Sequence, residues 1–174
     1  DGVLVDSEPL TNDVICANLA VHGFALTQVQ LTDLFLGGTM AGVMAKSREM
    51  GAQLPDHWLD EIYQEIFDAL QASVEPIPGA IDVLDALDRA GIPYAVGSNG
   101  PHRKMEISLG RTGLRPRLLG RIYSREDVAN PKPAPDVYLK AAADAGMAPE
   151  RCVVIEDSAN GARAGKAAGM VTLG

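Results

Sequence analysis

Cysteine, aromatic residues and long apolar runs are all scarce in this sequence. Its 174 residues include two cysteines, Cys16 and Cys152, so a disulfide framework is not expected and a reducing compartment fits. Aromatic residues make up only 5% of the chain, so the core should be mainly aliphatic. No apolar run reaches the roughly 20 residues that a membrane-spanning helix needs. We therefore expect a cytoplasmic protein without a membrane partner.

Positive charge is also in short supply. Lysine and arginine number 15 against 23 acidic residues, which gives a formal net charge of -8. An acidic surface repels nucleic acids and anionic membranes, so neither is an expected partner. A small phosphorylated substrate is still possible, because a metal ion and a few placed cations can invert the local field. A hydrophobic content of 47% and a charged content of 22% are ordinary for a globular protein.

The first part of the chain, residues 9–73, is expected to form a bundle of about four helices. Apolar residues recur there at helical spacing, and glycines such as the Gly37-Gly38 pair separate the runs. No alternating strand pattern interrupts them. The apolar positions are Leu10, Val14, Ile15 and Leu19, then Val43, Met44 and Met50, then Ile62, Ile66, Phe67 and Leu70.

From Pro76 onward the pattern changes to alternating helices and strands. The strands are nearly all apolar, which indicates a parallel sheet covered on both faces and an α/β fold. An apolar segment at 170–174 has the character of a further strand. Strands are expected near 94–98, 121–124 and 152–155, and helices near 80–90, 101–112, 135–145 and 159–168.

Polar residues follow three of these strands: Ser98-Asn99, Ser124-Arg125 and Glu156-Asp157. The carboxyl ends of parallel strands share one edge of a sheet, and ligands of open α/β sheets bind there. This rule brings Ser98, Glu156 and Asp157 to a common edge without reference to any known protein.

The acidic pair Glu156-Asp157 allows two interpretations. Two adjacent carboxylates need neutralisation, and a hard divalent cation such as Mg²⁺ takes oxygen ligands of this kind. The pair is equally typical of a solvated turn in which Asp157 or Ser158 caps the following helix. Taken alone, the pair does not decide between a metal site and a helix cap.

Two further segments are also ambiguous when taken alone. The hydroxyl and backbone N–H groups of Ser98-Asn99-Gly100 are suited to a phosphate oxygen, but Asn-Gly is also an ordinary turn sequence. Lys132 is flanked by Pro131 and Pro133, which restrict the backbone and aim its ammonium group. A surface lysine in a proline-rich connection is the alternative.

The order of these signals along the chain is more specific than any one of them. Asp1-Gly-Val-Leu-Val-Asp-Ser7 is followed by Ser98-Asn99, then Lys132, then Glu156-Asp157. This order resembles the four motifs of the haloacid-dehalogenase-like phosphatases. The first motif of that family contains two aspartates spaced by one residue, a nucleophile and a general acid/base. Asp1 matches the second aspartate, and the nucleophile would lie two residues upstream.

The resemblance implies a Rossmann-like parallel-sheet core with an inserted helical cap. The core would comprise residues 1–8 and 76–174, and the cap residues 9–75. Both ends of the core are expected to be truncated, with most of the first core strand preceding Asp1. The closest resemblance is to the β-phosphoglucomutase-like branch, which includes sugar-phosphate phosphatases. A short helical cap also implies a monomer.

The resemblance further assigns roles to individual residues. Asp1 would be the general acid/base and would bind Mg²⁺ through its carbonyl group, and Glu156 and Asp157 would complete the metal site. Ser98 would bind the phosphoryl group with help from Asn99. Lys132 would neutralise the nucleophile and the phosphoryl oxygens.

The substrate is expected to be a small phosphorylated metabolite. Thr39 follows a glycine pair in the cap and is expected to reach the substrate. The segment 98–105 is similar to a loop of some bacterial 6-phosphogluconate phosphatases, which favours a sugar or sugar-acid phosphate. The implied reaction is Mg²⁺-dependent hydrolysis of a phosphomonoester through an aspartyl-phosphate.

Several alternatives stay open at this point. A phosphosugar mutase is disfavoured, because residues 36–42 lack the cation that such mutases use there. A haloacid dehalogenase needs neither Asp1 nor a metal. A phosphoacceptor receiver domain carries its acidic pair early in the chain, whereas this pair lies near the end. A non-catalytic, truncated metal-binding module is the remaining alternative.

Overall fold

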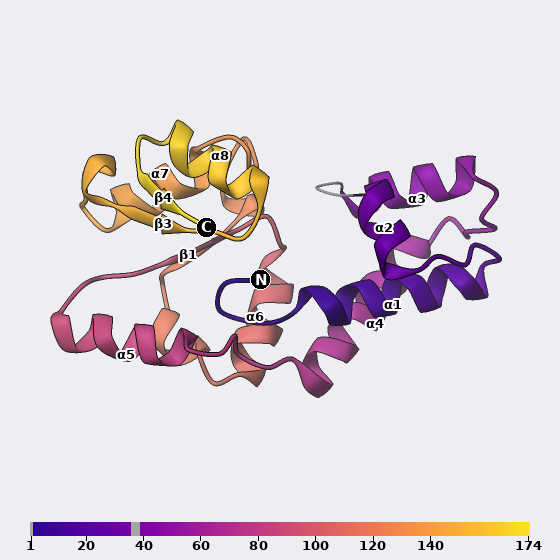
Figure 1. Cartoon of the computed structure of the whole chain (residues 1–174), viewed down its shortest axis with the longest axis horizontal. Helices are drawn as coiled ribbons and strands as arrows, with labels where there is room; N and C mark the ends of the chain where they lie inside the picture. The colour runs from indigo at the N-terminus through magenta and orange to yellow at the C-terminus, as the bar shows by residue number, and fades with distance from the viewer. Residues whose placement is uncertain (1, 36–38) are drawn as a thin grey trace. The chain divides into compact units, whose positions relative to one another are not determined.

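The computed structural model describes residues 2–35 and 39–174. The chain divides into two compact units: Asp1–Asp6 together with Glu75–Gly174, and Ser7–Val74 (Figure 1). This division lies within two residues of the expected core and cap limits. Asp1, with its expected catalytic role, and the expected break at Gly37-Gly38 lie outside the described residues.

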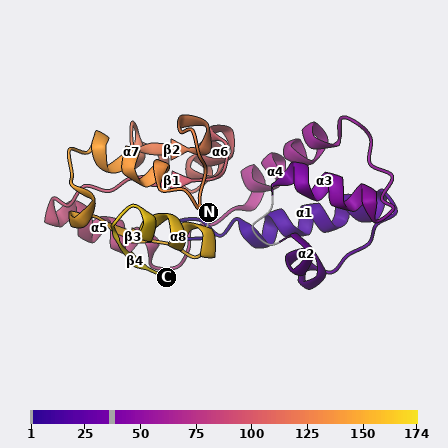
Figure 2. The ribbon, with the colours of Figure 1, turned by 90° about the horizontal axis from the view of Figure 1, so that it is seen from above.

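The Ser7–Val74 unit consists of helices. The pairing of α1 with α4 is the most extensive helix contact of this unit (Figures 1 and 2). Most of the apolar positions identified in the sequence are buried, and Leu19, Ile62 and Leu70 are fully enclosed. Met50 is an exception, because its side chain is exposed. No helix among the described residues is long and apolar enough to cross a membrane. The helices are α1 (Glu8–Val21), α2 (Gln28–Phe35), α3 (Met40–Glu49) and α4 (Trp58–Ser73).

A polar network joins α1 to α4. The indole Nε1 of the fully buried Trp58 donates to Asn18 Oδ1 at 2.6 Å, and Asn18 Nδ2 donates to Glu61 and Glu65 at 3.1 Å. Asn18 thus satisfies the one polar atom of the Trp58 ring inside an apolar interior. Sequence periodicity finds the buried face but gives no sign of this network.

The other unit alternates helices with short strands, as the sequence predicts. Each expected element forms, with ends that differ by at most two residues from the expected ones. Three short 3₁₀ turns, η1 (Arg115–Leu118), η2 (Arg125–Asp127) and η3 (Pro149–Arg151), complete the connections. The elements are α5 (Ala80–Ala90), β1 (Val96–Ser98), α6 (His102–Arg111), β2 (Ile122–Ser124), α7 (Asp136–Asp144), β3 (Val153–Ile155), α8 (Ala159–Ala167) and β4 (Val171–Leu173).

The strands form two parallel pairs (Figure 2). In the first pair Ser98 of β1 lies opposite Ser124 of β2, and in the second Ile155 of β3 lies opposite Leu173 of β4. The sequence predicts one continuous sheet. Within residues 2–35 and 39–174, however, no strand joins the two pairs, and the only further pairing is an isolated antiparallel bridge between Val5 and Pro76.

The β3–β4 pair is covered on one face only. Val154 points into a core shared with α7, α8 and Met170. Its neighbours Val153 and Ile155 are 59% and 55% exposed, because successive side chains of a strand point to opposite faces. The expectation of a sheet covered on both faces is therefore wrong for this pair, since both helices of the shared core pack on the same side.

Candidate active site

The structure brings Lys132 and Glu156 together although 24 residues separate them. The ammonium of Lys132 forms a salt bridge with Glu156 Oε1, and both side chains are 7% exposed. Glu156 directly follows β3, and Lys132 comes from the proline-rich connection between η2 and α7. A buried ion pair is costly to assemble unless other hydrogen bonds complete it, so its surroundings matter.

The carboxylate of Glu156 also accepts hydrogen bonds from Tyr138 and Ser158. The phenol of Tyr138, in the first turn of α7, donates to Oε1 at 2.9 Å. The backbone N–H and the hydroxyl of Ser158 donate to Oε2 at 2.9 and 2.8 Å. The Ser158 hydroxyl also accepts from the Gly161 N–H and caps α8. Of the two capping residues that the sequence allowed, the structure uses Ser158, and the cap also holds Glu156.

This environment keeps Glu156 ionised. Burial alone would raise the pKa of its carboxyl group, but Lys132 and Ser158 outweigh that effect and lower the pKa from its usual 4.5 to about 2. The same burial, reinforced by the Glu156 carboxylate, raises the pKa of Tyr138 well above its usual value. Tyr138 therefore stays protonated and remains a donor to Glu156.

The lowered pKa of Glu156 predicts an acid-sensitive contribution to stability. A carboxyl whose pKa is lower in the folded state stabilises the fold above its unfolded-state pKa and loses that contribution as the pH falls toward the folded-state value. The difference in unfolding free energy between wild type and Glu156→Gln should be constant above pH 4.5 and shrink between pH 4.5 and about 2. Urea unfolding across this range, in EDTA, measures it.

The exposed Glu150 offers a matched control for this prediction. Glu150→Gln should leave the pH dependence of stability unchanged. If Glu156→Gln showed the same acid sensitivity as the wild type, the assignment of that sensitivity to Glu156 would be wrong.

The loop after β1 lies next to Lys132. Ser98 is 8% exposed, and its hydroxyl accepts from the Gly100 N–H at 3.0 Å. The side-chain amide of Asn99 binds the backbone of Lys132 in both directions: Oδ1 accepts from its N–H at 2.9 Å, and Nδ2 donates to its carbonyl at 3.0 Å. The side-chain amide of Asn99 thus faces a protein group, and its expected help in binding a phosphoryl group stays a prediction.

The segment after Asp1 packs against Asp157. Gly2 has a positive φ of 69°, and a Cβ at this position would lie 1.6 Å from Asp157 Oδ2. Only glycine fits there, because both the backbone and the neighbouring carboxylate exclude a side chain. The Leu4 carbonyl accepts from the Ile77 N–H at 3.0 Å, which holds this segment in place.

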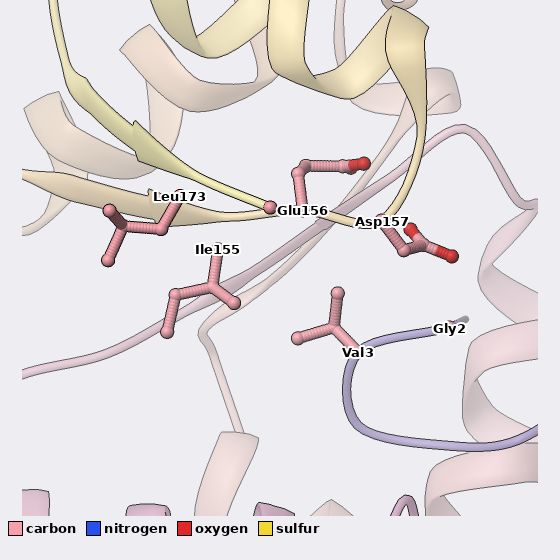
Figure 3. Close-up of a pocket in the computed structure, with 7 residues that line it drawn as sticks. Gly2, Val3, Ile155, Glu156, Asp157 and Leu173 are labelled. Carbon is pink, nitrogen blue, oxygen red and sulfur yellow. The ribbon is translucent and has the colours of Figure 1, made fainter.

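An open cavity of about 380 Å³ lies between this segment and the ends of β3 and β4 (Figure 3). Figure 3 shows the Asp157 carboxylate on the side of Gly2 and the Glu156 side chain turned away from that segment. The residues that line the cavity are Gly2, Val3, Ile155, Glu156, Asp157, Leu173 and Gly174.

The donor chemistry of this edge fits a hard cation such as Mg²⁺. Asp157 offers an exposed carboxylate beside the cavity, and oxygen ligands of this kind are those that Mg²⁺ prefers. Both oxygens of the Glu156 carboxylate already accept from Lys132, Tyr138 and Ser158, so the fit rests on Asp157. Among the described residues, no three histidine, cysteine or acidic side chains are arranged to hold a metal by themselves. Asp1, the third ligand expected from the resemblance, lies outside the described residues.

Thr39 belongs to the Ser7–Val74 unit, whereas the other described site residues belong to the unit that contains Glu75–Gly174. Its side chain is exposed, and its hydroxyl accepts from the Gly42 N–H at 3.1 Å as the N-cap of α3. The structure therefore gives Thr39 a capping role, and its contact with a substrate stays a prediction.

Sequence reasoning missed three residues of the site. Tyr138 binds Glu156 and lies under the Lys132 ammonium, with 4.7 Å between Nζ and the ring centroid. Ser124 donates its hydroxyl to the Gly100 carbonyl at 2.8 Å. A Cβ at Gly161 would lie 1.9 Å from Glu156 Cδ, so this glycine makes room for the carboxylate. Only Ser124, at a strand end, carried a signal in the sequence.

Comparison with known proteins identifies the family. A model of the haloacid dehalogenase-like hydrolases matches residues 1–169. The chain belongs to this family. Hexitol phosphatase A of Escherichia coli K12 is 32% identical over 171 residues, which cover 97% of this HAD-like hydrolase and 76% of that protein. The 6-phosphogluconate phosphatase of the same organism is 29% identical, with 98% and 76% covered.

A solved structure agrees with these relatives. A HAD family hydrolase from Deinococcus radiodurans R1, solved with bound phosphate and sodium, is 37% identical with a TM-score of 0.82. The match covers 99% of this chain and 76% of that one. The family resemblance and the α/β, Rossmann-like fold class are thereby confirmed. The prediction of an enzyme of the phosphatase type is confirmed by the family match together with the named relatives.

Proposed function

We propose that this HAD-like hydrolase releases phosphate from a small sugar or sugar-acid phosphate in a Mg²⁺-dependent reaction. The observation that carries the proposal is the cluster at the strand ends, where Ser98, Lys132, Glu156 and Asp157 belong to one unit and Lys132 is aligned by Glu156. The named relatives supply the substrate class, since they are a hexitol phosphatase and a 6-phosphogluconate phosphatase.

The proposed reaction has two steps. An aspartate two residues before Asp1 attacks phosphorus, and the P–O bond to the sugar breaks as Asp1 protonates the leaving oxygen. Asp1 then takes a proton from water, which attacks the aspartyl-phosphate and releases inorganic phosphate. This nucleophile is not among the 174 residues, so activity is to be measured on the complete protein, in the present numbering.

The described residues have proposed roles in neutralising charge, binding the phosphoryl group and holding the metal ion. The Lys132 ammonium offsets the repulsion between an attacking carboxylate and a phosphoryl group, and the Ser98 hydroxyl binds a phosphoryl oxygen. Glu156 and Asp157, with the Asp1 carbonyl, would hold Mg²⁺, which supplies further charge neutralisation when bound.

The remaining parts of the proposal concern the rest of the molecule. Residues 1–8 and 76–174 act as the catalytic core, and residues 9–75 act as a cap that selects the substrate, with Thr39 as a contact. The protein works as a monomer in the cytoplasm. Gel filtration at micromolar concentration tests the monomer, because a dimer would elute at twice the mass.

A phosphate-release assay on defined substrates tests the proposal. The complete protein should release phosphate from 6-phosphogluconate or hexitol phosphates with Mg²⁺ and not in EDTA. Asp157→Asn should lose at least about 100-fold in kcat/KM, because a ligand and a cavity-lining charge are both removed. The exposed Glu150→Gln serves as a matched control and should retain full activity. If wild type and Asp157→Asn were equally active, or wild type inactive on every phosphate, the proposal would fail.

A further inference from the structure

We propose that Asn99 is a positioning residue that acts through Lys132 and does not contact the substrate; this inference rests on the proposed phosphatase function. It assigns to Asn99 a role different from that of Ser98 beside it. The two residues are adjacent in sequence, but their side chains have different partners in the structure.

The backbone around Lys132 explains why it needs such a partner. Pro131 and Pro133 have no backbone N–H, so Lys132 supplies the only main-chain donor of these three residues. Asn99 Oδ1 accepts a hydrogen bond from the Lys132 N–H at 2.9 Å, and Asn99 Nδ2 donates to the Lys132 carbonyl at 3.0 Å. Two hydrogen bonds from one planar amide fix both the position and the orientation of the residue that they hold.

The backbone of Asn99 is held in place through its two sequence neighbours, Ser98 and Gly100. On one flank, Ser98 is the last residue of β1 and pairs with Ser124 of β2. On the other flank, the Gly100 carbonyl accepts from the hydroxyl of Ser124, which is fully buried. The amide of Asn99 therefore occupies a place set by β1 and β2.

A continuous chain of contacts thus runs from the β1–β2 pair to the acidic end of β3. It passes from Ser124 to the Gly100 carbonyl, along the backbone to Asn99, then to the main chain of Lys132, and through the Lys132 ammonium to Glu156. Because the two strand pairs share no ladder among the described residues, these contacts set how Lys132 sits relative to both. A displaced ammonium would stabilise a phosphoryl group less well.

A double-mutant cycle tests this in the complete protein with p-nitrophenyl phosphate as the probe. Asn99→Ala should lower kcat about tenfold with little change in KM. In the Lys132→Ala background the same substitution should change kcat/KM by less than about twofold, because the group that it positions is gone. If Asn99→Ala lowered kcat/KM by the same factor in the wild type and in Lys132→Ala, the proposal would be contradicted, since Asn99 would then act independently of Lys132.

A second measurement does not depend on activity. Acetylation of lysines by an N-hydroxysuccinimide ester, followed by peptide mass spectrometry, reports how accessible each ammonium is. Asn99→Ala should raise the labelling rate of the buried Lys132 at least about fivefold. Lys140, on the exposed face of α7, is the internal control and should react equally in both proteins. Unchanged labelling of Lys132 would contradict the proposal.

A graded variant guards against simple misfolding. Asn99→Asp keeps the acceptor for the Lys132 N–H but replaces the donor to the Lys132 carbonyl with a charged oxygen, so its kcat and its labelling rate should lie between those of wild type and Asn99→Ala. Urea midpoints of all variants show whether they fold. If the wild type released no phosphate, the proposed function would fail, and the labelling result alone would decide the role of Asn99.

Discussion

Lys132→Ala is expected to lower kcat/KM for phosphate release by about 100- to 1000-fold, with measurable residual activity, and to destabilise the fold by about 3–5 kcal/mol. The substitution removes the ammonium from a salt bridge and leaves the buried Glu156 carboxyl without its charged partner. An unpaired buried charge is far more costly than the loss of an exposed pair. Denaturant unfolding measures the stability change, and phosphate release by the complete protein measures the activity.

Lys140→Ala is the matched control for this prediction. Its ammonium pairs with Asp144 at 3.2 Å on the surface of α7, and both side chains are more than 40% exposed. Its loss should cost at most about 1 kcal/mol and leave activity intact. Equal effects of Lys132→Ala and Lys140→Ala would contradict the account of a buried pair.

A double variant separates the two roles of Lys132. Lys132→Met combined with Glu156→Gln removes both charges, so the fold should regain part of the lost stability. Activity should not return, because no ammonium is present to offset phosphoryl charge. Recovery of both properties together would mean that Lys132 has only a structural role.

Gly161→Ala is expected to have a second large effect. A Cβ at this position would lie 1.9 Å from Glu156 Cδ and 2.1 Å from its Oε1. The carboxylate would have to move, and it would then lose its contacts with Lys132, Tyr138 and Ser158. We expect a loss of about 3 kcal/mol in unfolding free energy and a severe loss of activity, both measurable as for Lys132→Ala.

Gly110→Ala provides the control for a glycine in a helix. Gly110 lies within α6, and a Cβ there would meet nothing within 4 Å. Alanine is the better helix former, so this substitution should be neutral or stabilise by up to about 1 kcal/mol. If Gly161→Ala were equally harmless, the close packing of α8 against Glu156 would be contradicted.

The edge of the site could be predicted from the sequence because it follows from the direction of the strands. Ser98 and Glu156 each come at or directly after the end of an apolar segment, and parallel strands bring such ends to one edge. The α/β class followed in the same way from the alternation of helical and apolar patterns. These inferences depend only on local sequence and on general rules of sheet topology.

The contacts inside the site could not be predicted in this way, because they join distant segments. Nothing near Tyr138 indicates that its phenol binds Glu156, and the need for glycine at 161 arises only once that carboxylate folds back over α8. Likewise, the motif around Asn99 gave no sign that its side-chain amide binds the backbone of Lys132. The exposed faces of Val153 and Ile155 were also unexpected, since an apolar strand does not reveal which of its faces is covered.

A Mg²⁺ titration of phosphate release, run side by side on the complete wild-type protein and on Asp157→Asn, tests the central claim most directly. We predict that EDTA abolishes wild-type activity, that Mg²⁺ restores it in a saturable way, and that Asp157→Asn needs at least about 100-fold more Mg²⁺ or does not respond. Full activity in EDTA, or the same Mg²⁺ dependence in both proteins, would contradict a Mg²⁺-dependent phosphatase centred on this cluster.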